Sequence, residues 1–178
     1  KTCLDKSFTA ADTYGHRCAN RAINFLQKHC EEDFLLVLSF DEPHHPSLCP
    51  SPFNQMFPEY PNAPELPAVA DWPDSPEHHN IWRRHAIKIG GERGWPVQGK
   101  EMLRCNAFLD AEIGRVLDVV NRVSPDALII YSTDHGDDLG EHGLFNKGAA
   151  MFDSITRIPF IARWPNRIPE GMVCPNPV

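Results

Sequence analysis

Short apolar runs that alternate with helical stretches constrain the fold of this chain more than any other feature. The runs are "FLLVLSF" (34–40), "ALIIYS" (127–132) and "IPFIARW" (158–164). Continuous apolar runs of this length are typical of strands that are buried on both faces of a sheet. Helical stretches precede the first two runs, at residues 11–29 and 97–123. This order predicts an α/β fold with a mostly parallel sheet flanked by helices.

Both helical stretches are indicated by the spacing of their apolar residues. The first places Ala19, Ala22, Ile23 and Leu26 on one face. The second has the stronger signal, with one apolar stripe that faces a core. That stripe consists of Leu109, Ile113, Val116, Leu117 and Val120.

Proline is concentrated in one region, because ten of the 17 prolines lie between Asp41 and Asn80. Proline has no amide donor, so this region cannot form a central strand. We predict a long ordered excursion over the surface, and we treat residues 41–96 as a proline-rich insertion within a single domain, residues 1–178. Six polar or aromatic residues near its end are expected on a solvated helix face, with a specificity pocket as the alternative: His78, His79, Trp82, Arg83, Arg84 and His85.

The composition excludes several classes of partner. The formal charge of −7 argues against nucleic acid, since phosphate binding requires clustered Lys and Arg. No stretch approaches the length of a membrane span, and no signal peptide stands at the front. We expect a cytoplasmic location, with the periplasm as the alternative if a signal precedes Lys1.

The six cysteines show no metal-ligand spacing and are expected as thiols, with disulfides as the alternative. The oligomeric state is left open.

Two loops with titratable side chains follow the first two apolar runs. They are "FDEPHHP" after residues 34–40 and "STDHGDDLGEHG" after residues 127–132. In open α/β sheets, ligands bind outside the carboxyl ends of the strands. We therefore expect both loops to contribute to one site.

Each candidate residue in these loops has two interpretations. Asp134 and His135 could turn toward one divalent cation, or they could form an ordinary Asp-His-Gly turn. Lys147 could bind a phosphate or sulfate oxygen, or be a solvated surface group. His44 or its neighbour His45 could donate a proton to a leaving oxygen, or pack in a rigid turn.

The order of these motifs resembles the sulfatases, within the alkaline-phosphatase-like superfamily. The shared stretches are "FLLVLSFDEPHHP", "FLDAEIGRVLDVV", "STDHGDDLGEHGLFNKG" and "ITRIPFIARWP". The most specific part is the pattern D-H-G-x-x-L-G-E-x-G-x-x-x-K followed by R-x-P-x-I-x-R-W-P. The resemblance implies a partial alkaline-phosphatase-like domain, and it covers most of the chain from about Ala11 onward.

The resemblance also implies roles for individual residues. Asp134 and His135 correspond to two metal ligands, Lys147 to a lysine that contacts the sulfate group, and His44 to a histidine near the ester oxygen. The implied cofactor is a divalent metal ion, with calcium expected and manganese, magnesium or zinc as alternatives. His45 has no clear equivalent. Four nearby groups are implied to shape the loop rather than bind metal: Asp137, Asp138, Glu141 and His142.

The chain departs from the family pattern in its nucleophile. Family members carry an acidic pair on an earlier strand and then C-x-P-x-R or S-x-P-x-R, whose Cys or Ser becomes formylglycine. Neither feature occurs here; Cys49, for example, is followed by P-S-P-F. We therefore expect an internal fragment of a sulfuric ester hydrolase that acts on small-molecule sulfate esters, with formylglycine in a missing upstream segment. The 178-residue chain itself is predicted to be inactive. The alternatives are a phosphonate monoester or phosphodiester hydrolase and a non-catalytic relative used for binding.

Overall fold

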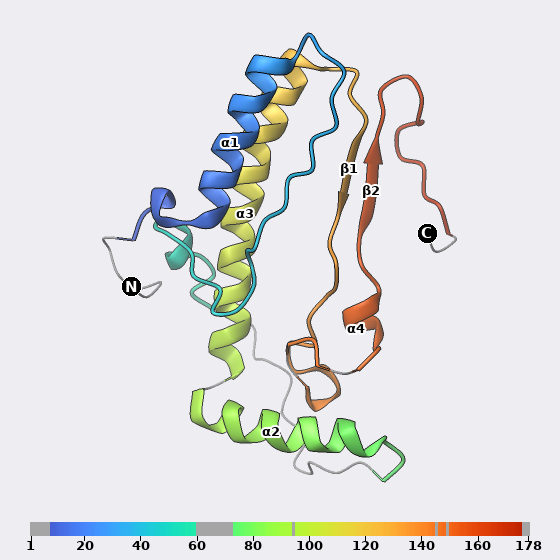
Figure 1. Ribbon diagram of the computed structural model, residues 1–178. Coiled ribbons are helices and arrows are strands. Elements are labelled where there is room, and N and C mark those ends of the chain that lie inside the picture. The colour runs from blue at the N-terminus through green and yellow to red at the C-terminus, as the bar shows by residue number, and fades with distance from the viewer. Residues whose placement is uncertain (1–7, 60–72, 94, 145, 149, 176–178) are drawn as a thin grey trace.

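Two long parallel helices form one layer of the molecule, and extended segments run back along them (Figure 1). The computed structural model describes residues 8–59, 73–93, 95–144, 146–148 and 150–175. The helices are α1 (Tyr14–His29), α2 (Glu77–Arg93), α3 (Trp95–Val123) and the single-turn α4 (Asp153–Thr156), and the strands are β1 (Ile129–Ser132) and β2 (Phe160–Arg163). Short 3-10 turns lie at Ala10–Asp12, Phe53–Gln55 and Glu141–Gly143. Helix α2 lies across one end of this layer, beneath α4 (Figure 1).

The packing of α1 against α3 forms the main core. Helix α1 begins after Thr13, whose hydroxyl oxygen accepts a hydrogen bond from the His16 amide at 3.1 Å. This N-cap satisfies a donor that has no partner within the helix. The core consists of Ala19, Ala22 and Leu26 from α1 with Val116, Val119 and Val120 from α3. Both helices were predicted, and the structure confirms them.

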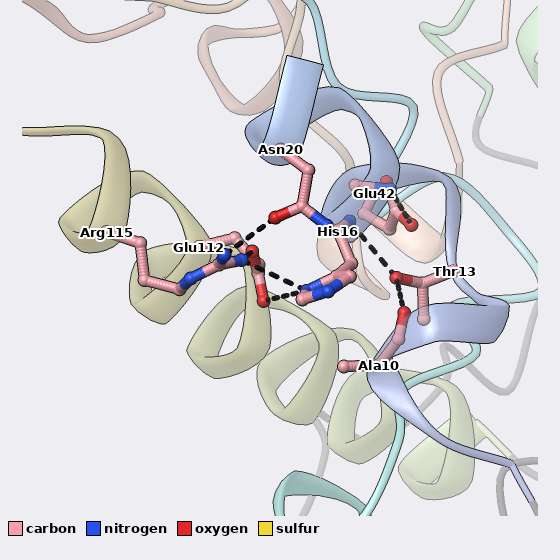
Figure 2. Close-up of polar contacts among 8 residues, drawn as sticks. Ala10, Thr13, His16, Asn20, Glu42, Glu112 and Arg115 are labelled. Atoms are coloured by element: carbon pink, nitrogen blue, oxygen red, sulfur yellow. Dashed lines mark hydrogen bonds and ion pairs between the residues drawn. The ribbon is translucent and has the colours of Figure 1, made fainter. Parts of the chain in front are cut away.

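Polar side chains cross the same interface near the start of α1 (Figure 2). Glu112 of α3 is 5% exposed. One of its carboxylate oxygens lies 2.9 Å from His16 Nδ1, and the other accepts from Arg115. Arg115 also donates to the Asn20 side chain at 2.7 Å. Charged and amide groups thus join α1 to α3 beside the apolar core.

The predicted strand at residues 34–40 is extended but pairs with no strand in the part of the chain that the structure describes. Burial on both faces was also wrong. Four of its side chains pack against the α1–α3 core, whereas Leu35 and Val37 are 88% and 81% exposed. The packed side chains are Phe34, Leu36, Leu38 and Phe40. The physical reason is that helices cover only one face of this segment.

The prediction of a mostly parallel sheet is corrected in the same region. Strands β1 and β2 were both expected, but they pair antiparallel, with Ile129 opposite Arg163 and Ser132 opposite Phe160. Parallel pairing needs a crossover that returns the chain to the starting end of the first strand, usually through a helix. In the described part of the connection, the only helices are the turn Glu141–Gly143 and the four-residue α4, which are too short to do so, and β2 returns in the opposite direction. The α/β class itself holds, and β1 follows α3 as residues 34–40 follow α1 (Figure 1).

The proline-rich insertion is partly described. Residues 41–59 form a series of turns, residues 60–72 lie outside the described residues, and α2 follows. The domain bounds 1–178 and 41–96 therefore stay predictions.

Cys105 is a thiol that is fully buried with Cys49 and Phe108, in agreement with the expected reduced cysteines. Within the described ranges, no helix combines the length and apolar character needed to cross a membrane.

Candidate functional site

The loop after β1 brings a carboxylate and an imidazole together at its start. Asp134 Oδ2 lies 3.7 Å from His135 Nε2. The Nδ1 atom of His135 faces the carbonyl oxygen of Gly136 at 2.7 Å. Because a carbonyl oxygen only accepts, Nδ1 carries the proton, and Nε2 of the neutral ring keeps a lone pair 3.7 Å from the carboxylate oxygen.

Two electron-pair donors at this separation can both bind one cation. Fixing one imidazole nitrogen through a backbone carbonyl is a common way to orient a metal-binding histidine. The Asp134 side chain is 84% exposed, so it is open to an ion. Among the described residues no group of three or more His, Cys, Asp or Glu could hold a metal. Asp134 and His135 thus fit part of a metal site.

The ionisation of Asp134 suits this use. Desolvation is the largest single influence on Asp134 and opposes ionisation, but the neighbouring His135 together with hydrogen bonds from the Asp134 amide, the His135 amide and the Thr133 hydroxyl outweigh it. The pKa of Asp134 is consequently lowered. A carboxylate that stays ionised at neutral pH can bind a cation without first losing a proton.

Asp137 and Asp138 shape the rest of the loop. Asp137 Oδ1 accepts the amides of Leu139 at 2.9 Å and Asn146 at 3.1 Å, and thereby closes the loop upon itself. Asp138 is 1% exposed and accepts from the Ser154 hydroxyl at 2.5 Å. Burial raises the pKa of both carboxyl groups. Both residues therefore act through the loop backbone and α4, as groups that shape a loop do.

Gly136 is required where the loop passes α4. Its amide donates to the Ile155 carbonyl at 2.8 Å. A Cβ atom at this position would lie 2.0 Å from the Ser154 carbonyl oxygen, which is closer than real contacts allow. The glycine of the Asp-His-Gly sequence thus permits a close approach of two backbones.

Lys147 is exposed near the end of the same loop, directly after Asn146. The positive charge of Lys147 favours the ionised form of Asp137 and so acts to lower the pKa of that carboxyl group. His135 has the same effect from the other end of the loop. His135, Asp137 and Lys147 are therefore close enough to interact electrostatically. The loop brings three of the four predicted site residues into one region: Asp134, His135 and Lys147.

His44, the fourth predicted site residue, lies in a tight turn of the other loop. Its Nδ1 donates to the His45 carbonyl at 2.8 Å, so its Nε2 carries a proton only when the ring is charged. The preceding Glu42 accepts from the Gly15 amide at 2.9 Å, which ties this turn to the start of α1 (Figure 2). Within the described residues, no hydrogen bond or ion pair joins His44 to Asp134, His135 or Lys147. The shared site thus stays a prediction.

Helix α2 contributes one residue, Arg83, whose burial was predicted incorrectly from the sequence. Arg83 was expected on a solvated face, yet it is 1% exposed, and burial lowers its pKa. Its Nε donates to the His142 carbonyl at 2.8 Å. Arg84 and His85 are exposed, as predicted. Helix α2 has no continuous apolar stripe, so its sequence does not indicate which side is buried.

Comparison with known proteins agrees with these motifs. A family model described as Sulfatase matches residues 5–175. The chain belongs to the sulfatase family. An uncharacterized sulfatase from Escherichia coli, YidJ, is 39% identical over 91% of this chain and 32% of its own length. Human iduronate 2-sulfatase is 29% identical over 85% of this chain and 31% of its own length.

A solved structure supports the fold of this sulfatase-family chain. The phosphonate monoester hydrolase from Silicibacter pomeroyi matches with a TM-score of 0.77 and 21% sequence identity. The match covers 89% of this chain and 34% of that chain, and it shows a partial alkaline-phosphatase-like fold. The chain spans about a third of the length of the curated relatives it matches.

Proposed function

We propose that this chain is the part of a sulfatase that binds the sulfate group of a small-molecule sulfate ester. The observation that carries the proposal is the loop after β1. It places Asp134 Oδ2 3.7 Å from His135 Nε2, and the exposed cation of Lys147 lies near its end. An anionic ester needs such positive charge around its oxygens, from a lysine and a metal ion.

Each residue of this chain has a distinct part in the proposal. Asp134 and His135 would hold a divalent cation, with calcium expected, together with ligands from outside this chain. The ion would supply positive charge for the sulfuryl oxygens. Lys147 would bind one of those oxygens as a point charge. Formylglycine, the expected nucleophile, would also come from outside this chain.

His44 would act on the leaving alcohol. Its Nδ1 is already bonded to the His45 carbonyl, so the charged ring offers the Nε2 proton to the departing oxygen. The neutral ring that remains keeps its Nδ1 proton and the same hydrogen bond. The turn therefore keeps the ring in one orientation before and after proton donation.

The test is turnover by the longest natural protein that contains this chain, with an aryl sulfate and the matching aryl phosphonate as substrates. Lys147→Ala should lower kcat/KM for the sulfate by about 10²–10³, the cost of removing one group that stabilises transition-state charge. Lys88→Ala is the matched control, because Lys88 is an exposed lysine of α2.

Preferential turnover of the phosphonate would favour the alternative hydrolase, and no turnover of either ester would favour a binding role. The chain of 178 residues should show no turnover by itself. Turnover by the isolated chain that His44→Ala abolishes would contradict the proposed division of the site.

A further inference from the structure

Arg83 is a buried cation that links α2 to the candidate site. Its guanidinium is expensive to bury unless its donors are satisfied. Nη1 donates to the Ser75 hydroxyl at 2.9 Å and to Asn80 Oδ1 at 2.8 Å. Both acceptors belong to α2 or to the residues just before it, and they orient the guanidinium. Nε is thereby directed at the His142 carbonyl, 2.8 Å away in the loop after β1.

The loop that receives this hydrogen bond has an unfavourable backbone. Leu139, His142 and Asn146 have φ angles of 45°, 54° and 58°, in the left-handed region. Side chains other than glycine rarely adopt this conformation, and it persists where the surroundings hold it. Arg83 provides such a contact from another element, at the carbonyl of one of these residues.

Lys147 lies between two points at which α2 touches the loop. Arg83 binds the loop at His142, and the adjacent Trp82 lies against Gly148, where a Cβ atom would be 2.7 Å from the indole nitrogen. Within the loop, Asp138 donates its amide to the Asn146 carbonyl at 3.1 Å. These contacts therefore hold the loop at described residues on both sides of Lys147.

We propose that Arg83 is a positioning residue, which fixes the loop at His142 and so places the Lys147 ammonium for contact with the anionic substrate. The proposal rests on the function proposed above for Lys147. Arg83 itself is buried and does not contact the substrate. Its effect on turnover should therefore depend on the presence of Lys147.

The test compares Arg83→Gln with Arg84→Gln in the longest natural protein that contains the chain. Arg84 is the matched control, since it is the next residue of α2, is exposed and pairs with Glu77. Amide hydrogen exchange should become about tenfold faster or more over residues 138–148 in Arg83→Gln, as expected when a hydrogen bond from a buried charged group is lost. Exchange in α1 and α3 should not change.

Turnover of an aryl sulfate provides the second measurement. Arg83→Gln should lower kcat/KM about tenfold in the unmodified protein and have almost no further effect in a Lys147→Ala background. If Arg83→Gln fails to fold, Arg83→Lys replaces it, because lysine keeps the charge and can donate to one acceptor. An intermediate increase in exchange is then expected.

Unchanged exchange over residues 138–148 would overturn the proposal, whatever the activity. An equal loss of kcat/KM with and without Lys147 would also overturn it, because a general structural role affects both backgrounds alike. Absence of turnover in the unmodified protein would instead refute the proposed function, and this result is distinct from both.

Discussion

Replacing Glu112 tests how strongly charge holds α1 to α3. The Glu112 side chain contacts His16 and Arg115 (Figure 2). The side chains of Glu112, His16 and Arg115 are 6%, 24% and 41% exposed. A hydrogen bond to a charged group contributes about 1.5–3 kcal/mol. Solvent screens the more exposed Arg115, so that pair contributes about 1 kcal/mol or less. Together with the void left behind, Glu112→Ala should lower the free energy of unfolding by about 2–3 kcal/mol.

Glutamine provides a graded comparison at the same position. Its amide oxygen can still accept from Arg115, and its nitrogen can donate to a neutral His16 ring. Glu112→Gln should therefore cost only about 1 kcal/mol. Glu77→Gln is the exposed control, because the Glu77 side chain is 70% exposed and pairs with Arg84 at the surface. That change should stay within about 0.5 kcal/mol.

Urea denaturation followed by far-ultraviolet circular dichroism measures these differences. With a slope of about 2–3 kcal/mol per molar urea, Glu112→Ala should lower the midpoint by about 1 M. Equal midpoints for Glu112→Ala and wild type, or a Glu77→Gln shift as large as that of Glu112→Ala, would show that charge at Glu112 does not hold α1 to α3.

Three further predictions concern the core, a thiol and the loop. Leu26→Ala should lower the free energy of unfolding by about 3 kcal/mol, since Leu26 is 1% exposed in the core, whereas Leu35→Ala at an 88% exposed position should change it little in the same urea titration. Burial raises the pKa of the Cys105 thiol to about 12, so at pH 8 its thiolate is scarce, and mass spectrometry should show iodoacetamide modifying Cys30 long before Cys105. Gly136→Ala should displace the loop from α4, and limited proteolysis should then cleave residues 137–148 faster than in wild type; an unchanged cleavage rate would contradict the 2.0 Å contact.

The helices were predictable because their burial is periodic in the sequence. Leu26, Val116 and Val120 lie at the positions that the spacing indicated, and all three are buried. Residues 34–40 have no such periodicity in their sequence. An unbroken apolar run does not reveal which face a neighbour covers, and here the helices cover only the side that carries Phe34 and Phe40.

Strand pairing and the support of the loop depend on contacts between distant residues. Nothing in the sequence of β1 or β2 distinguishes parallel from antiparallel pairing; the shortness of α4 does, once its length is known. Likewise, the loop motif marked Asp134 and His135 but not Arg83. The burial of an arginine on a polar helix cannot be predicted until the position of the carbonyl that it binds is known.

The one-sided packing of residues 34–40 has a practical consequence for handling the protein. Leu35 and Val37 are largely exposed on an extended segment, and Ile130 and Ile161 on the neighbouring strands are 56% and 61% exposed. Exposed apolar segments of this kind promote edge-to-edge association between chains. Expressed alone, the chain should form soluble oligomers or precipitate as its concentration rises. Val37→Lys should delay that onset without loosening the α1–α3 core, because residue 37 faces away from it.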